Sequence, residues 1–469
     1  MQVSYATIRA VDARRIVFPP LVNMFHLLPG QLIALVSMLV ILIGATLLLL
    51  PWATPPDVHL GLLDAVFTAT SAVCVTGLIV KDTAKDFTIF GQLVILFLIQ
   101  IGGLGYAAMS TLLLLAAGHR FGLRERMMIA EALSALDMAH LLRLVQIVFI
   151  MTLCMEGVGA VILAMEFLQD MPLGEALYHG LFHAVSAFNN AGFSTFSTNL
   201  IGYELSWTVD LTVAVLIFCG GIGFLVYRDI LENVLGERFR FHTHTKLALL
   251  VSVLLLVIGT IGFALMEWRN PQSLGGLSVF DRLLPAFFHS LSARSAGFNT
   301  LNLNDIGDET LYLLIILMAI GGSPGSTAGG IKTTAFGIVC LAVWSILLRR
   351  GDVMIFYRRI PTEIANRAIA LVLLAFGTIT MMTLTLAWIE AQPFLSLMFE
   401  VTSALGTVGF SVGDGGGQSL SALFSPIGKG LIIVCMIVGR FGPLLLGLFA
   451  VRSTVPVTYR YPEAKVSIG

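Results

Sequence analysis

Long apolar stretches separated by short polar connections dominate the hydrophobic pattern of this chain. A helix needs about 20 apolar residues to cross a bilayer, and eight stretches fit that requirement, one of them interrupted. They are Gln31–Leu50, Gly91–Ala117, Leu144–Leu168, Thr208–Tyr227, Leu247–Met266, Tyr312–Ala319 continuing after a break to Leu348, Ala368–Ile389 and Leu431–Val451. The pattern predicts a polytopic membrane protein.

Four similar short segments lie between these stretches, and each carries a glycine where an apolar half-helix would otherwise continue. They read TSAVCVTGLIV, VSAFNNAGFS, SLSARSAGFN and TSALGTVGFS, and their aligned glycines are Gly77, Gly192, Gly297 and Gly409. A phenylalanine lies ten positions before each glycine, namely Phe67, Phe182, Phe287 and Phe399. Recurrence at fixed offsets predicts four copies of one unit.

The repeats define the fold class that we expect, an all-α polytopic membrane protein. Each M1–P–M2 repeat has a long helix (M1), a short re-entrant pore helix (P), a glycine loop and a second long helix (M2). Eight principal transmembrane helices and four pore helices would then surround one central pore. The predicted boundaries are a cytoplasmic N-terminal segment 1–30, pore repeats 31–118, 141–235, 244–349 and 363–452, and a cytoplasmic tail 453–469.

Composition supports the membrane assignment, and charge orients it. Hydrophobic residues make up 57% of the chain and charged residues 12%, against about 25% charged in a soluble domain. Of the 27 Lys and Arg residues, 19 lie in the two terminal segments and in alternate connections. The positive-inside rule therefore predicts that both termini are cytoplasmic and that the glycine loops face outward. Because topology accounts for the basic residues, we expect no nucleic-acid partner.

The four glycine loops are candidates for a cation filter. Half-helices of about 12 residues are too short to span, and non-helical backbone at membrane depth persists only where protein or a water-filled cavity surrounds it. Four such loops can converge on one axis, where backbone carbonyls replace the hydration shell of an ion. The pore helices would direct their negative ends toward that ion. Turns with only packing roles are the structural alternative.

The phrases SAVCVTGL, SARSAGFNT and GGSPGSTAGGIKTT resemble the Trk/Ktr/HKT superfamily of potassium transporters, and the resemblance covers residues 30–452. One span before the first half-helix makes the chain more similar to the Ktr-type membrane subunit (KtrB) than to TrkH, which has two extra N-terminal helices. The resemblance implies a selectivity filter that binds K+ through the backbone carbonyls of Val75, Thr76, Gly77, Asn190, Ala191, Gly192, Ser295, Ala296, Gly297, Thr407, Val408 and Gly409. Sodium-restricted plant relatives have serine at the first glycine, so Gly77 indicates potassium.

Each second helix carries a small-residue motif: GGLG (Gly102–Gly105), GGIG (Gly220–Gly223), GGSP (Gly321–Pro324) or GRFG (Gly439–Gly442). In the third repeat the motif extends to GGSPGSTAGG, through which a helix continues only at a cost. We expect an unwound segment there, and the resemblance implies that it is an intramembrane gate. The predicted gate residues are Gly321, Gly322, Ser323, Pro324, Gly325, Ser326, Gly329, Gly330, Lys332 and Arg440. A purely structural kink is the alternative.

Charged residues inside the spans are costly and are functional candidates by default. Arg440 would oppose cation flow below the filter, or pair with a neighbouring carboxylate or carbonyl. Lys332 would act similarly or extend to the cytoplasmic face. We expect Arg294 to point behind the filter and to hydrogen-bond its backbone, and Glu156 to be either an ion or proton site or a paired structural residue. Four acidic residues on or beside the half-helices would raise the cation concentration at the outer face: Asp64, Glu175, Asp281 and Glu400.

These features predict potassium uptake across the cytoplasmic membrane by a protein that is not an enzyme. K+ would be the transported ion and Na+ a coupling or activating ion, with no cofactor in this chain. The resemblance implies a homodimer that docks a cytoplasmic nucleotide-binding regulatory ring (KtrA/TrkA-like) and contacts membrane lipids. The alternative is a proton- or sodium-coupled secondary carrier of a small organic solute, since such carriers also have broken helices near the midplane. A membrane enzyme would need a nucleophile–base set or metal ligands within the spans, and none is evident.

Overall fold

The computed structural model describes residues 29–105, 141–236, 241–413 and 417–450. The predicted cytoplasmic tail, nearly all of the predicted N-terminal segment and residues 106–117 of the second predicted span lie outside the described residues.

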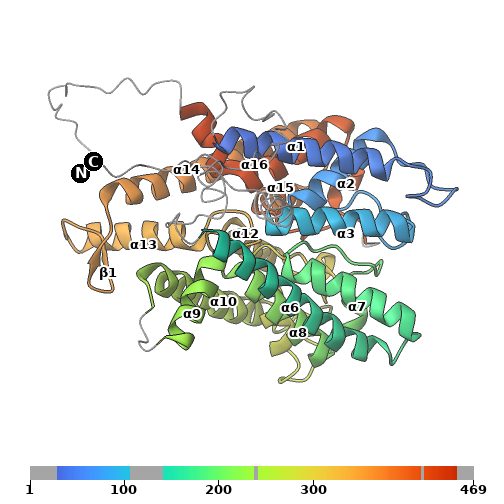
Figure 1. Ribbon diagram of the computed structural model, residues 1–469, viewed down its shortest axis with the longest axis horizontal. Helices are drawn as coiled ribbons and strands as arrows, with labels where there is room; N and C mark the ends of the chain where they lie inside the picture. The colour runs from blue at the N-terminus through green and yellow to red at the C-terminus, as the bar shows by residue number, and fades with distance from the viewer. Residues whose placement is uncertain (1–28, 106–140, 237–240, 414–416, 451–469) are drawn as a thin grey trace, which may run out of the picture.

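Helices make up almost all of the regular secondary structure among the described residues, and they recur in the predicted M1–P–M2 order (Figure 1). Repeat 1 has α1 (Pro29–Leu48), α2 (Leu62–Val73) and α3 (Ile89–Leu104). Repeat 2 has α6 (Leu141–Phe167), α7 (Leu173–Phe188), α8 (Trp207–Gly221) and α9 (Phe224–Leu235). Repeat 3 has α10 (Thr243–Glu267), α11 (Leu283–Ser292), α12 (Asp308–Ala319) and α13 (Thr333–Leu347), and repeat 4 has α14 (Thr362–Ile389), α15 (Phe394–Gly406) and α16 (Pro426–Ala450).

Minor elements complete the described part of the chain. Short 3-10 helices follow the glycine loops of repeats 2, 3 and 4, at Ile201–Tyr203, Leu303–Asp305 and Leu420–Leu423. Strands β1 (Met354–Ile355) and β2 (Arg358–Arg359) form a small antiparallel hairpin between α13 and α14. The described structure is therefore all-α apart from one surface hairpin.

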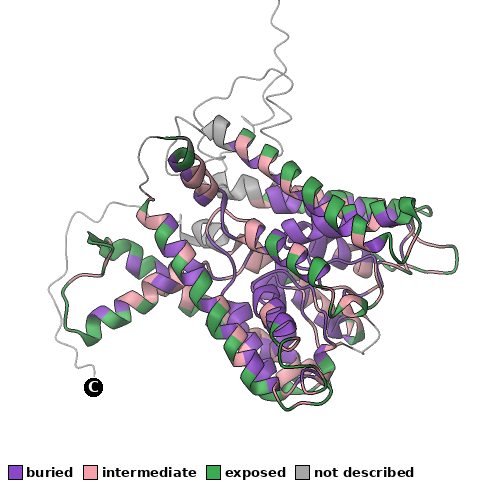
Figure 2. Ribbon diagram, turned by 90° about the horizontal axis from the view of Figure 1, so that it is seen from below, coloured by how far each residue is buried: buried purple, intermediate pink, exposed green. Residues whose placement is uncertain are grey.

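The four repeats close a ring. The pore helices are α2, α7, α11 and α15, and each packs against the first long helix of its own repeat. Neighbouring repeats meet through α3 and α7, α8 and α11, α12 and α15, and finally α16 and α2. Since the last contact joins repeat 4 to repeat 1, the pore helices surround a common axis, with buried residues inside and exposed ones on the outer helices (Figure 2).

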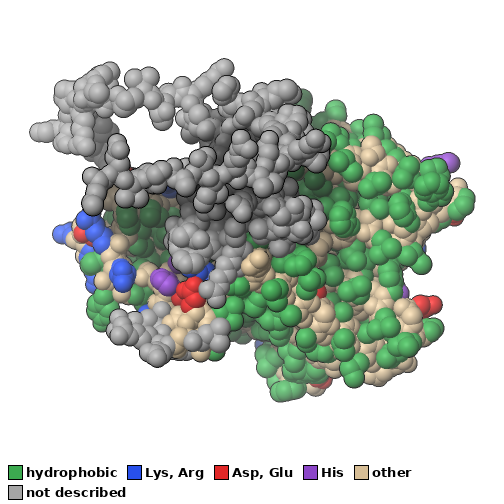
Figure 3. Space-filling model, in the orientation of Figure 1, with side chains coloured by type: hydrophobic (Ala, Val, Ile, Leu, Met, Phe, Trp, Pro, Cys, Tyr) green, Lys and Arg blue, Asp and Glu red, His purple; other side chains and the backbone are tan. Residues whose placement is uncertain are grey.

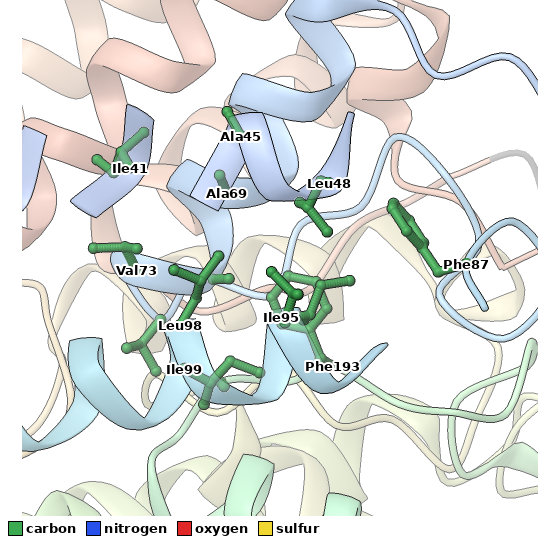
Figure 4. Packing of buried hydrophobic residues seen from close by; sticks show 14 of the residues in the cluster. Ile41, Ala45, Leu48, Ala69, Val73, Phe87, Ile95, Leu98, Ile99 and Phe193 are labelled. Carbon is green, nitrogen blue, oxygen red and sulfur yellow. The ribbon is translucent and has the colours of Figure 1, made fainter. Parts of the chain in front are cut away.

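The large apolar residue after each filter glycine links neighbouring repeats of the ring. Phe193, which follows the filter glycine of repeat 2, is 1% exposed and packs in the core of repeat 1 with Leu48, Ile95 and Leu98 (Figure 4). Repeats 3, 4 and 1 insert their corresponding residue into the core of the preceding repeat in the same way: Phe298, Phe410 and Leu78. Full burial of such a side chain contributes about 1.5–3 kcal/mol. This exchange explains why a large apolar residue follows every filter glycine.

The outer surface is apolar, as expected of helices in a bilayer. Three described segments are long and apolar enough to cross a membrane, Val145–Phe167, Thr243–Glu267 and Thr362–Ile389. Figure 3 shows hydrophobic side chains over most of the right-hand part of the visible face, while basic side chains gather at the left end, where Figure 1 places β1 and α13.

One predicted span is wrong in shape. The stretch Thr208–Tyr227 is not a straight helix, because α8 and α9 meet at an angle of 94°. The bend lies at Gly223, whose φ of +96° is open to glycine but rarely to other residues. Gly105 occupies the corresponding place after α3 and also has a positive φ, +77°. In repeat 4, where Arg440 replaces a glycine of the motif, α16 continues without a break.

Candidate functional site

The pore helices stop through a defined backbone motif. At the end of α2, the N–H of Val75 donates to Ala72 O (3.1 Å) and the N–H of Thr76 donates to Ser71 O (2.8 Å). Together with the left-handed φ of Val75, +56°, this is a Schellman cap. The same pair of bonds ends α7 at Asn190 and Ala191, and α15 at Thr407 and Val408. In α11 the bonds shift by one residue, and both Ala296 and Gly297 donate to Ser292 O.

Backbone conformation alternates in all four loops. Positive φ values occur at the filter glycine and two positions before it: Val75 (+56°) and Gly77 (+86°), Asn190 (+59°) and Gly192 (+69°), Ser295 (+79°) and Gly297 (+75°), Thr407 (+50°) and Gly409 (+96°). The residue between them has a negative φ in each loop. A β-strand sends successive carbonyls to opposite sides, whereas an alternation of φ sign allows them to face one side. Four loops with this geometry can present carbonyl oxygens to a common axis.

The structure brings the four loops together as a ring in chain order. The Cα of each filter glycine faces the carbonyl oxygen that precedes the next glycine: Gly77 faces Ala191, Gly192 faces Ala296, Gly297 faces Val408, and Gly409 faces Thr76. A Cβ built on any of these glycines would also lie 3.0–3.1 Å from the Cα of the next one. No side chain fits at these positions without displacing a neighbouring loop, which accounts for glycine in all four repeats.

Hydrogen bonds from the pore helices anchor the segment after the glycine in repeats 2, 3 and 4, and the sequence motif indicates them only in part. Ser186 Oγ donates to Phe193 O (2.7 Å) and Ser292 Oγ to Phe298 O (2.6 Å). His183 Nε2 lies 2.8 Å from Ser194 Oγ. The sequence signal for these bonds is the serine of the two GFS motifs, Ser194 and Ser411. Its partner, nine residues before the glycine, is not evident from the sequence.

Repeat 4 anchors its loop with an acid where repeat 2 uses a histidine. Glu400 is fully buried and accepts hydrogen bonds from Ser411 Oγ (2.5 Å), Ser421 Oγ and Ser421 N (2.9 Å). The expectation that Glu400 attracts cations at the outer face is therefore wrong, because its carboxylate is occupied by its own loop.

The outer mouth above the filter is lined mainly by uncharged residues, with Asp82 as an acidic residue at its border. A small cavity there is bordered by the filter glycines of three repeats and by hydroxyl and amide side chains such as Ser197, Asn199, Asn299 and Gln418. The other three acids that we expected at this face do not border it. Asp64 pairs with Lys429 at 2.8 Å, Asp281 accepts a hydrogen bond from Ser278, and Glu175 is exposed.

The break in repeat 3 is unwound, as predicted. No helix lies between Ala319 and Thr333, and a single parallel bridge joins Ile320 to Ile331. The break is bonded to repeat 2, since Ser323 N and Thr327 N donate to Gly221 O (2.9 Å) and Gly220 O (3.2 Å).

The break is also bonded to the filter of its own repeat. Gly329 N donates to Ser295 Oγ (3.0 Å), and Ser295 Oγ lies 2.9 Å from Thr407 O. The unwound segment therefore touches the loops that form the ring.

Arg440 joins the break to the second helix of repeat 1. Its guanidinium donates to the backbone carbonyls of Thr327 and Gly102. The carbonyl pairing that we considered for this residue is present, and it places the positive charge between the break and α3. Its effect on cation flow stays a prediction. Lys332 does not extend to the cytoplasmic face, because its Nζ donates to Ala328 O within the break (2.7 Å).

Arg294 is turned away from the filter, but its predicted partner is wrong. It does not bond the filter backbone. Instead it donates to Ser252 O (2.8 Å) and Ser252 Oγ (3.2 Å) on α10. An arginine next to the loop reaches the neighbouring helix more easily than the loop itself, because the Schellman-type bonds already use the adjacent backbone groups.

Glu156 belongs to a buried polar cluster that joins two repeats. Its carboxylate accepts hydrogen bonds from Gln100 Nε2 of α3 (3.2 Å) and from Nδ2 of Asn189, the residue directly after α7 (2.9 Å). Asn189 directly precedes filter residue Asn190, and a Cβ on Gly103 would overlap its amide. Among the described residues Glu156 has no basic partner, so the paired structural reading fits its contacts.

Comparison with known proteins agrees with this architecture. The TrkH family, described as a cation transport protein, matches residues 31–454. The chain is 38% identical over 442 residues to the Ktr system potassium uptake protein B of Bacillus subtilis, which covers 94% of this chain and 97% of that protein. It is 34% identical over 450 residues to the potassium/sodium uptake protein NtpJ of Enterococcus hirae, covering 95% and 98%.

Among solved structures, the crystal structure of the potassium transporter TrkH from Vibrio parahaemolyticus is similar in fold. The TM-score is 0.71 at 18% sequence identity, over 89% of this chain and 84% of that one. The fold, the order of the repeats and the extent of the sequence match lead to one assignment. The chain belongs to the TrkH family of cation transport proteins and is a multi-pass membrane protein.

Proposed function

We propose that this protein takes up potassium across the cytoplasmic membrane, as the ion-translocating subunit of a Trk/Ktr-type system. The observation that carries the proposal is the closed ring, in which each filter glycine lies against the carbonyl of the next loop. Rings of backbone carbonyls replace the hydration shell of a cation. The choice of K+ rests on the names of the relatives, which are potassium uptake proteins.

The electrostatics around the ring fit a monovalent cation held by dipoles. None of the predicted filter residues is charged, and the C-terminal ends of four pore helices meet there. Each such end carries a partial negative charge of about half an elementary charge. Carbonyls and helix ends would stabilise a dehydrated ion without binding it too tightly to leave.

The break at Gly321–Gly330 would gate the path, with Lys332 and Arg440 as its charged elements. Arg440 closes the space between the break and α3 through two carbonyls. A fixed positive charge below the filter opposes cation passage, so opening would require the guanidinium or the break to move.

The proposal includes orientation, partners and ions that follow from charge placement and from the relatives. Both termini would be cytoplasmic, with the β1–β2 hairpin on the same side, where Arg358 and Arg359 are exposed. The name Ktr system, carried by the relatives, is that of a system with more than one component. A partner subunit is in keeping with that name. The homodimeric state, the cytoplasmic nucleotide-binding ring and Na+ as a coupling or activating ion are proposed from the resemblance to the Trk/Ktr/HKT superfamily.

Potassium uptake in cells that lack their own importers tests the proposal. The comparison is between the wild-type chain, Gly77→Ser and a matched Gly174→Ser control, since a Cβ on Gly174 meets nothing within 4 Å. We expect growth at low potassium with the wild type and the control, and its loss or conversion to sodium entry with Gly77→Ser. Absence of uptake by the inserted wild type would refute the potassium function. Uptake that Gly77→Ser leaves unchanged would refute the filter and favour the organic-solute carrier.

A further inference from the structure

An apolar groove lies between the break of repeat 3 and the peripheral helix α14. Its volume is about 240 Å³, which exceeds the roughly 150 Å³ of an apolar cavity that binds benzene. Leu371, Ala375, Thr378 and Ile379 form its wall on α14. The opposite wall consists of the end of the break, the end of pore helix α15 and the small-residue face of α16: Gly330, Ile331, Lys332, Leu405, Gly406, Val438 and Gly439.

The groove is continuous with the lipid-facing surface. In its most apolar 18-residue window, α14 is only 17% buried, the lowest value of the three long spans. Leu373 and Met381 on its outer face are 66% and 67% exposed. Leu374 borders the groove and is still 48% exposed, so the groove reaches the outside of this helix.

The chemistry of the walls selects a hydrocarbon rather than a headgroup. Among the described residues that line the groove, Lys332 is the only charged one, and its Nζ already donates to Ala328 O. In the described part of the lining, Thr378 is the only residue with a hydroxyl group. An apolar cavity of this kind does not hold water well, because water needs two to four polar partners. The ammonium of Lys332 is held at one end of the groove by Ala328 O, so most of the lining is suited to a hydrocarbon chain and not to a phosphate.

We propose that this groove is a binding site for one acyl chain of a membrane phospholipid, and that an occupied groove holds the break in its closed position. The effect of the lipid on transport rests on the proposed potassium function, whereas the binding of the lipid does not. The groove lies between the break and α14. Gly330–Lys332 would move into this space when the path below the filter opens. An acyl chain in that space opposes this movement.

Photo-crosslinking in liposomes tests the binding. The probe is a phosphatidylcholine with a diazirine on one acyl chain, added to phosphatidylglycerol liposomes that contain the full chain. We expect label on the peptide that contains Ile331 and Ala335, and loss of that label in Ala375→Trp, which fills the groove. Leu373→Trp places the same side chain on the outer face of α14 and serves as the matched control, with label retained.

A second variant protects the test against misfolding. Ala335→Leu fills the groove from α13 and is expected to remove the same label. Absence of label on the break in the wild type would overturn the proposal and would indicate that another part of the chain or a second copy covers the groove. Label that persists in both filled variants would also overturn it.

Potassium efflux from the same liposomes tests the effect. A tryptophan at Ala375 cannot leave the groove, so we expect the maximal flux to fall about tenfold, a shift of about 1.4 kcal/mol toward the closed state, while Leu373→Trp is unchanged. Equal flux in both variants would overturn the inhibitory role. A wild type that is labelled but carries no potassium would refute the proposed function and leave the site standing, whereas transport without label would do the reverse.

Discussion

Alanine substitution of the four filter glycines tests the ring, because the structure ranks their effects. All four have a positive φ, between +69° and +96°, and an L-residue in the left-handed region costs about 1–2 kcal/mol. The new methyl group also meets the carbonyl oxygen of the next loop. At Gly192 that contact would be 2.8 Å, and at the other three glycines it would be shorter.

These numbers predict an order. All four substitutions carry the backbone cost, which corresponds to a roughly 5- to 30-fold loss of the ion-competent conformation, and all four displace a carbonyl. The displacement is smallest for Gly192→Ala, whereas Gly77→Ala, Gly297→Ala and Gly409→Ala must move the carbonyl of the next loop further. Their loss should exceed about 30-fold, and Gly409, with the largest φ, should be among the most sensitive.

The assay is the initial rate of potassium uptake in importer-deficient cells, normalised to the amount of protein in the membrane. Gly105→Ala is the matched control, since Gly105 has a φ of +77° but nothing lies within 4 Å of its Cβ position. It separates backbone strain from collision. If Gly192→Ala is as damaging as Gly409→Ala, or if Gly105→Ala is as damaging as Gly77→Ala, collision with the next loop is not the cause and the ring argument fails.

Two further predictions concern contacts between repeats. Arg440→Ala removes hydrogen bonds from a charged donor to two carbonyls, and we expect basal potassium efflux from liposomes to rise by about tenfold or more; an unchanged efflux would mean that Arg440 does not restrict the closed path. Asp64→Asn weakens the ion pair with Lys429 (2.8 Å), which joins α2 to α16. The side chain of Asp64 is 20% exposed and that of Lys429 is 14% exposed. The cost should lie near 1–3 kcal/mol, between exposed and buried pairs, and should lower the melting temperature in detergent, whereas an unaltered melting temperature would contradict a stabilising pair.

The repeat order and the unwound segment of repeat 3 could be predicted because glycine and proline have local consequences. A glycine such as Gly77 marks a backbone conformation that other residues rarely adopt, and the GGSPGSTAGG run disfavours a helix wherever it lies. The phenylalanines at fixed offsets indicated repetition. They did not indicate that Phe193 packs in the neighbouring repeat, because that contact depends on how the repeats are arranged in space.

Other features depend on tertiary contacts that no local pattern contains. The apolar run after Gly223 reads as a continuous span, and the 94° bend follows from a close approach of Pro324, whose carbonyl would lie 2.6 Å from a Cβ at Gly223. Arg294 bonds Ser252, which lies 42 positions earlier in the chain. Glu400 was placed at the outer face by its position beside a half-helix, whereas its burial follows from two serines that come after the filter.

The residues two positions before the filter glycines suggest that filter and break are mechanically linked. A glycine would adopt their left-handed conformation without steric cost, yet valine, asparagine, serine and threonine occupy these positions. In repeat 3 the side chain joins two segments: Ser295 Oγ donates to Thr407 O in the ring and accepts a hydrogen bond from Gly329 N in the break. A Cβ on Gly329 would overlap the side chain of Thr407 as well. Any movement of the break that separates Gly329 from Ser295 therefore releases a hydrogen bond at the filter loop, and the proposed gate would be coupled to the ring.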